Sequence, residues 1–293
     1  ATSPTPTRPG LATALWISGF LSMVSPWSRV ELHFLRDYPE AAGWMAAALW
    51  LSALTLRSAH LLNDSLLSQF VRLRTQATPA ALASAYRSSI RIMALVAIPL
   101  SCFGAAAVPW LLPRLFGLEF SSAVPAAVAL LLGSITMIWS PHSALVTADG
   151  NPRFLWASQL LTTAPFLLAV AVLVPRYGLP AAVALRLIGQ CFSVGVGAWY
   201  IRTRLHLCTP WRSLNRQLLA ALAFASPALL VGLQNDGVAS PLLWGLGVLA
   251  YLILLPRCHP FTAEDRNRLA PVLFPFPPWL TKALFPPKDD ACT

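Results

Sequence analysis

Charged residues are scarce in this chain. Asp, Glu, Lys and Arg together make up 11% of its 293 residues, whereas a soluble domain normally holds about 25%. Apolar residues account for 56% of the chain, and the mean hydropathy is +0.62. Apolar runs of roughly 20 residues, the length that crosses a bilayer as a helix, recur along the whole sequence. The composition therefore argues against a soluble domain and predicts an all-α polytopic membrane protein.

The chain also lacks the common motifs of metal binding and catalysis. Its five cysteines show no CxxC or other ligand spacing, so neither a disulfide nor a metal site is predicted, and no cofactor is expected. No DxD, GxSxG or HExxH motif occurs. His60 and Asp64 form H-x-x-x-D, which is one residue shorter than the spacing found in acyltransferases. The sequence therefore predicts a protein that is not an enzyme.

Eight apolar segments are predicted to cross the membrane. Breaks rich in Gly, Pro and Asn, such as "ADGNPRF" and "VPRYGLP", separate them. Pro99, Pro141, Pro165 and Pro227 fall inside spans and are expected to kink the helices, which neighbouring helices tolerate in a membrane. The spans are placed at residues 11–29, 41–63, 89–112, 122–147, 154–174, 179–201, 216–234 and 239–256.

The distribution of basic residues predicts the orientation of these spans. With the N-terminus inside, fifteen of the 21 Lys and Arg residues fall in inner segments, four in outer segments and two within spans. The positive-inside rule then places both termini in the cytoplasm. The net charge of +10 is spread over short segments between spans, so anionic membrane lipids are expected partners and nucleic acid is not.

The spans divide the chain into four regions. Residues 1–10 are predicted to be a cytoplasmic segment, 11–201 a lobe of six transmembrane helices, and 202–256 two additional transmembrane helices. Residues 257–293 are rich in Pro and aromatics and are predicted to be a cytoplasmic tail at the membrane interface. Within the lobe, residues 64–88 combine helical apolar spacing with a basic side, which predicts a pair of amphipathic helices lying on the membrane surface.

Four stretches, in order, carry a resemblance to a known family. They are "EAAGWMAAALWLSAL" (40–54), "LLPRLFGLEFSSAVPAAVALLLGSI" (111–135), "ALVTADGNPRFLWASQLL" (144–161) and "VPRYGLPAAVALRLIG" (174–189). Together they resemble the C-terminal part of polysaccharide exporters, such as O-antigen flippases, of the multidrug/oligosaccharidyl-lipid/polysaccharide (MOP) exporter superfamily. Members have 12 to 14 spans in two lobes. The resemblance therefore implies a second lobe plus two C-terminal helices, with the first lobe missing or divergent.

The resemblance implies a function as well as a fold. It implies transport of a lipid-linked glycan of the undecaprenyl-pyrophosphate type across the inner membrane, for polysaccharide and lipopolysaccharide biosynthesis. Polysaccharide polymerase and assembly proteins are further implied partners. A drug/cation antiporter of the related MATE type, and a degenerate half-transporter that serves as a scaffold, are the alternatives. The mid-span positions contain Arg but no Asp or Glu, which favours an anionic substrate over a cationic one.

Ionisable residues inside spans are the candidate substrate-binding residues. Arg57, His60 and Asp64 follow at i, i+3 and i+7 and therefore share one helix face. Arg57 either faces a wet cavity or extends its charge to the cytoplasmic interface. Arg186 lies nearer the middle of its span, with Gln190 one turn later on the same face. It either faces a cavity or bonds backbone carbonyls. A cationic cavity would suit a pyrophosphate, so Arg57, His60, Arg186 and Gln190 are predicted to bind substrate.

Other polar or small residues are predicted to have structural roles. His142 is expected to form a hydrogen bond in the core. Gly195 and Gly197 are expected to allow close helix packing. Asp149 and Asn151 are expected to form a turn and a helix cap.

Overall fold

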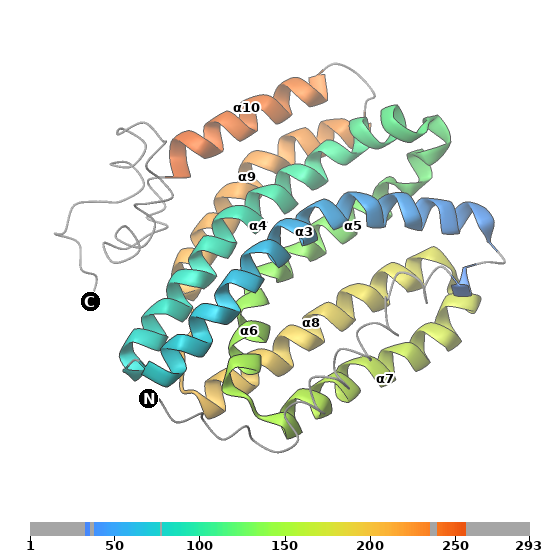
Figure 1. Ribbon diagram of the computed structural model, residues 1–293. Helices are drawn as coiled ribbons and strands as arrows, with labels where there is room; N and C mark the ends of the chain where they lie inside the picture. Colours follow the sequence, from blue (N-terminus) through green and yellow to red (C-terminus); the bar gives the residue numbers. More distant parts are fainter. Residues whose placement is uncertain (1–32, 36–37, 77, 235–238, 256–293) are drawn as a thin grey trace.

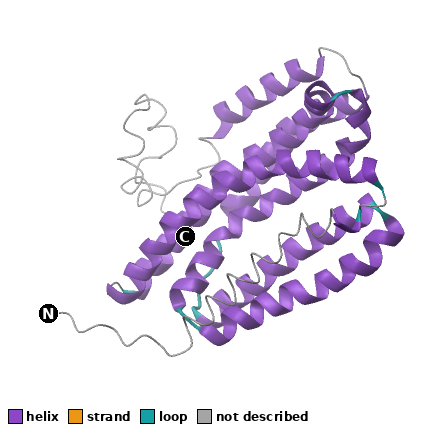
Figure 2. Cartoon of the chain, turned by 45° about the vertical axis from the view of Figure 1, so that its right-hand side comes forward, coloured by secondary structure: helices purple, strands orange, loops and turns teal. Residues whose placement is uncertain are grey.

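The computed structural model describes residues 33–35, 38–76, 78–234 and 239–255, with the backbone alone for 54–65, 76, 212 and 239. Every regular element in these ranges is a helix, as Figure 2 shows, so the predicted all-α class is confirmed. The elements are α3 (Pro39–Gln76), α4 (Pro79–Phe116), η1 (Leu118–Ala123), α5 (Val124–Gly133), η2 (Ser134–Trp139), α6 (Ser140–Asp149), α7 (Pro152–Tyr177), α8 (Leu179–Arg204), α9 (Trp211–Gln234) and α10 (Ala239–Leu254).

Five helical segments of the described chain are long and apolar enough to cross a membrane. They are α4, the segment Leu118–Asp149, α7, α8 and the part of α9 from Ser213 to Gln234. Helix α10 is apolar but has only 16 residues, or about 24 Å. The predicted span 41–63 lies within α3, and the predicted span 11–29 lies outside the described residues. The membrane-spanning architecture is thus confirmed, and the number of eight spans stays a prediction.

Helices α3 and α4 are longer than the sequence predicted. Each has 38 residues and therefore a length of about 57 Å, nearly twice the thickness of the hydrocarbon core. No Gly or Pro occurs between Gly43 and Pro79, so nothing interrupts α3 before Gln76. Thr78 then caps α4 by accepting a hydrogen bond from the Ala81 amide, at 3.4 Å. The predicted surface-lying helix pair at 64–88 is wrong, because these residues continue α3 and begin α4.

The segment Leu118–Asp149 is a broken helix and not one regular span. The 3-10 turn η2 separates α5 from α6 directly before Pro141. Pro141 has no amide proton for the carbonyl of Met137, and the amide of Ser140 bonds that carbonyl instead. The break is anchored to α4, because the hydroxyls of Ser101 and Ser134 lie 2.7 Å apart and are buried. This irregular backbone lies beside the cavity described below.

The helices pack in two groups, which Figure 1 shows at different sides of the molecule. Helix α4 packs on α9, α9 on α10, and α3 on α5 and α6. Helices α7 and α8 form a hairpin, and α8 contacts α5 and α6. The indole nitrogen of Trp244 on α10 donates to the carbonyl of Phe103 on α4, at 2.8 Å. Leu168, Leu219 and Leu242 each expose more than half of their surface, as expected for side chains that face lipid.

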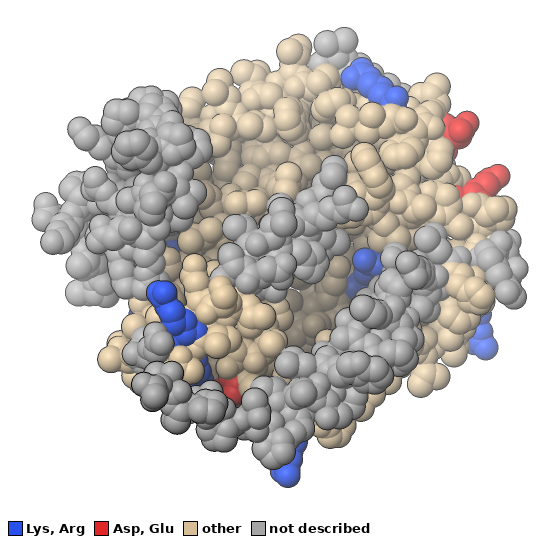
Figure 3. All heavy atoms as spheres, in the orientation of Figure 1, with Lys and Arg blue, Asp and Glu red and all other residues tan. Residues whose placement is uncertain are grey.

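Basic residues of successive helices gather at one end of the bundle. The C-terminal ends of α3, α6 and α8 and the N-terminal starts of α4, α7 and α9 meet there. We call this the basic end; it holds Arg72, Arg74, Arg87, Arg153, Arg202, Arg204 and Arg216. The opposite end holds Arg114, Arg176, Glu40 and Glu119. Figure 3 shows the same pattern on one face, with charged side chains mostly at the rims and one basic side chain in a central hollow.

Candidate functional site

A cavity of about 410 Å³ with a mixed polar and apolar lining lies between η2, α6, α7 and α8, and we call it the polar cavity. Ligand sites in proteins commonly have volumes of roughly 300–1,000 Å³, so this cavity is large enough for a small head group. It runs along α8 from Arg186 to Gly197. Those positions are eleven residues apart, or about 16 Å along the helix axis. The cavity is therefore elongated, and its far end points toward the basic end.

Arg186 is the only Lys, Arg, Asp or Glu among the described residues that line this cavity. It is half-buried and lies about 10 Å from the start of α8. A guanidinium has five N–H donors, so it can bind an anion while keeping a contact with the protein. The nearby Gln190 also lines the cavity, and its Oε1 is buried with no hydrogen-bond partner. Together these residues place a positive charge and an unsatisfied acceptor on one wall.

His142 faces the same cavity from α6 and is 4% exposed. Its Nε2 lies 2.7 Å from the hydroxyl of Tyr86, which in turn lies 3.3 Å from the hydroxyl of Thr209. The predicted core hydrogen bond is therefore present. The second ring nitrogen, Nδ1, is buried and has no partner. A Cβ on Gly197 would lie 3.4 Å from that of His142, so the predicted close packing at Gly197 is also present.

An apolar groove of about 970 Å³ adjoins the cavity on α7 and α8. Side chains such as Leu161, Ile188, Phe192 and Trp199 line it. Phe154, Ser158 and Val196 line both the groove and the polar cavity, so the two share a wall. Gly195 also lines the groove, and a Cβ added to it would meet no atom of the described residues within 4 Å. The described helices therefore do not show the close packing predicted at Gly195.

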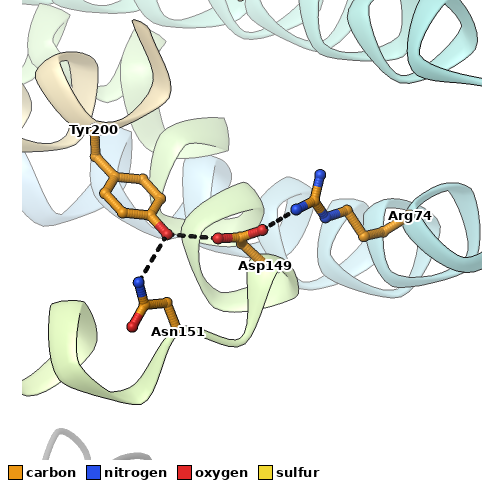
Figure 4. A network of polar contacts seen from close by, with 4 residues as sticks. All are labelled: Arg74, Asp149, Asn151 and Tyr200. Atoms are coloured by element: carbon orange, nitrogen blue, oxygen red, sulfur yellow. Dashed lines mark hydrogen bonds and ion pairs between the residues drawn. The ribbon is translucent and has the colours of Figure 1, made fainter. Parts of the chain in front are cut away.

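A network of polar side chains joins four helices at the basic end (Figure 4). Arg74 on α3 forms an ion pair with Asp149 at the end of α6. The hydroxyl of Tyr200 on α8 donates to the other carboxylate oxygen at 2.5 Å, and Asn151 donates to Tyr200 at 3.4 Å. Asn151 also caps α7 by accepting from the amide of Phe154, as predicted. The Phe154 ring stacks on Tyr200 with centroids 3.9 Å apart. Because Phe154 lines both the polar cavity and the apolar groove, this contact connects the network to both.

The structure brings together two of the four predicted substrate-binding residues. Arg186 and Gln190 line one cavity. Arg57 and His60 belong to the helical backbone of α3, but their side chains lie outside the described residues. Sequence reasoning assigned Asp149 to a turn and missed its ion pair. One signal was present: Asp149 is the only Asp or Glu between Glu119 and Asp236.

The described residues thus define an all-α, membrane-spanning protein with a singly charged polar cavity beside an apolar groove. No family model, curated protein or solved structure matches the chain.

Proposed function

We propose that this chain is a membrane transporter, a flippase that moves a lipid-linked oligosaccharide or polysaccharide precursor across the inner membrane. The observation that carries the proposal is the pairing of two sites. A polar cavity with Arg186 as its one charged described lining residue shares a wall with a long apolar groove. An amphiphile with an anionic head and a hydrocarbon chain matches that pairing. The proposal agrees with the resemblance to polysaccharide exporters noted in the sequence.

The charge in the cavity supports an anionic head group. An arginine within a membrane span costs about 2.5–3.5 kcal/mol on insertion scales, so it is normally retained for a purpose. Its planar fork binds phosphate oxygens in a bidentate manner, and a pyrophosphate offers several of them. No Asp or Glu lines the described part of the cavity. This lining disfavours a cationic drug as the substrate.

The groove supports a hydrocarbon chain attached to that head group. Its described lining is almost entirely apolar and lies on two helices that are long and apolar enough to span a membrane. A polyprenyl chain in the groove would reach the cavity over Phe154 and Val196, which belong to both sites. The head group could thus be enclosed by protein while the chain stays in an apolar environment. This arrangement lowers the cost of moving the head group through the membrane.

The basic end of the bundle supports an orientation with this end in the cytoplasm. The proposal then has the substrate enter where Arg74, Arg153 and Arg204 lie, near anionic lipid head groups. Both termini would be cytoplasmic. Polysaccharide polymerase and assembly proteins are the proposed partners, since they would receive the exported glycan.

A binding experiment on the purified full chain in detergent micelles tests the substrate class. Three probes share one polyprenyl chain and differ in the head group: pyrophosphate, a neutral alcohol and a primary amine. The proposal expects tightest binding of the pyrophosphate, with a loss of at least about tenfold on Arg186→Gln. The exposed Arg176→Gln, at the end opposite the basic end, is the matched control and should bind like the wild type. Preference for the amine, or equal binding of all three probes, would reject the proposal.

A further inference from the structure

Uncharged polar side chains line much of the cavity beyond Arg186. Eight hydroxyl side chains line it: Thr136, Ser140, Ser143, Thr147, Ser158, Thr162, Thr163 and Ser193. Five of these donate their proton to a backbone carbonyl three or four residues earlier in the chain, at 2.7 to 3.0 Å. A hydroxyl whose proton is used in this way presents only lone pairs to a ligand. Away from Arg186, the described cavity wall therefore offers acceptors from these hydroxyls and donors such as the amide of Gln159.

Three polar atoms in this wall have no hydrogen-bond partner among the described residues. They are Oγ of Ser140, Nδ1 of His142 and Oε1 of Gln190, and all three are buried. Leaving such an atom unsatisfied costs about 1–3 kcal/mol, so most buried polar atoms in proteins are paired. Three unpaired atoms on one cavity indicate a ligand that supplies the missing bonds. His142 is the most telling of them, because it is 4% exposed and its other nitrogen is already bonded to Tyr86.

These atoms are ordered along the cavity. Gln190 lies one helical turn, about 6 Å, from Arg186 on α8. Gly197, which packs against His142, lies about 10 Å further along the same helix. A positive charge at one end is thus followed by neutral hydrogen-bonding groups over a length greater than one helical turn. A phosphate has acceptors only, so it fits beside Arg186, whereas the remainder of the wall, with both donors and acceptors, fits a group that donates and accepts.

From this order we infer that the cavity contains a subsite for sugar hydroxyls next to the anion site, on the side toward the basic end. A hydroxyl both donates and accepts, so it satisfies Gln190 in either amide orientation and His142 in either tautomer. The ligand class is a neutral sugar attached directly to the phosphate held by Arg186. This inference rests on the proposed function and adds that the protein recognises the sugar as well as the charge.

The test compares two probes with the same polyprenyl group. One is a polyprenyl pyrophosphate, and the other is the same lipid with one sugar on its terminal phosphate. Binding to the purified full chain is measured for the wild type, for Ser140→Ala and for Gln190→Leu. The side-chain oxygens of Ser140 and Gln190 have no hydrogen-bond partner in the described part of the chain. Removing them costs no hydrogen bond, so both variants should unfold at or above the wild-type temperature. Gln217→Leu is the matched control. Gln217 is fully buried with both side-chain polar atoms unpaired, but it lies on α9 outside the cavity.

The wild type should bind the sugar-bearing probe more tightly than the bare pyrophosphate. Ser140→Ala and Gln190→Leu should each reduce this sugar-dependent gain by about three- to tenfold, and Ser140→Ala should leave binding of the bare pyrophosphate unchanged. Gln217→Leu should change neither the sugar-dependent gain nor the binding of the bare pyrophosphate. Equal binding of both probes to the wild type, or an unchanged gain in both cavity variants, would overturn the sugar subsite while the proposed function stands. Binding of neither probe would overturn the proposed function and this inference with it.

Discussion

Arg74 and Asp149 form an ion pair although 75 positions separate them in the sequence. The pair is asymmetric, because the Arg74 side chain is 41% exposed and the Asp149 side chain only 6% exposed. Asp149 also accepts a hydrogen bond from Tyr200. The contact therefore holds the ends of α3, α6 and α8 together beneath the cavity.

The asymmetry predicts unequal effects of removing either partner. Arg74→Ala leaves a buried carboxylate without its counter-ion and should destabilise the protein by about 2–3 kcal/mol. Asp149→Ala leaves a cation that water can reach and should cost only about 1 kcal/mol. Thermal unfolding in detergent measures both, and Arg72→Ala is the control because Arg72 is exposed and outside the network.

The double variant gives the sharper result for this pair. Arg74→Ala combined with Asp149→Ala should be more stable than Arg74→Ala alone, because the buried charge is removed as well. A double variant less stable than both single variants would show that the two residues act independently.

Arg186 is predicted to matter for transport and not for folding. Arg186→Ala should abolish glycan export while the protein stays in the membrane at the wild-type level, because losing a charge inside a span eases insertion. Arg186→Lys should restore export in part, since the charge returns without the bidentate fork. The amount of exported glycan and the amount of the protein in the membrane fraction are measured in the same cells. Loss of the protein from the membrane fraction in Arg186→Ala would assign Arg186 a structural role.

The groove can be blocked without disturbing the packing. No atom of the described residues lies within 4 Å of a Cβ added to Gly195 in the groove, so Gly195→Phe should fold normally and fill the path of the hydrocarbon chain. It should weaken binding of a long polyprenyl pyrophosphate by about tenfold and spare a short, water-soluble pyrophosphate. Gly43→Phe is the control, because Gly43 on α3 also has nothing within 4 Å. An equal loss of binding for the long and the short probe would place the hydrocarbon chain outside the groove.

The orientation of the bundle is open to chemical labelling. In a background without native cysteines, the Glu119→Cys variant should react with an impermeant reagent added outside the cell, and the Thr78→Cys variant should not. Glu119 lies in the first turn of η1 at the end opposite the basic end, and Thr78 precedes α4 at the basic end. The reverse labelling pattern would invert the orientation given by the positive-inside rule.

The helical spans could be predicted from the sequence because hydropathy and helix breakers are local signals. The turn between α6 and α7 illustrates this: Gly150 takes a left-handed conformation, φ 63°, and Asn151 and Pro152 begin the next helix. The stretch 64–88 was misassigned because an amphipathic surface helix and the extension of a long helix have the same local pattern. Only the packing of α3 and α4 distinguishes them.

The candidate site could be predicted only in part. Arg186 and Gln190 were found because an ionisable residue inside an apolar span is conspicuous. The Ser and Thr side chains of the cavity were missed, since single hydroxyls are common in apolar helices and their meeting depends on how α6, α7 and α8 pack. The partners of Asp149 were missed for the same reason: Arg74 and Tyr200 are 75 and 51 residues away.

The central claim, transport of a lipid-linked glycan, is tested most directly in liposomes that contain the purified full chain. A polyprenyl-pyrophosphoryl sugar is placed in both leaflets, and its accessibility to an impermeant sugar-oxidising enzyme is followed over time. We predict that the wild type exposes the inner-leaflet fraction, whereas protein-free liposomes and liposomes with Arg186→Gln protect it. A wild-type rate equal to that of protein-free liposomes, or an Arg186→Gln rate equal to that of the wild type, would contradict the account.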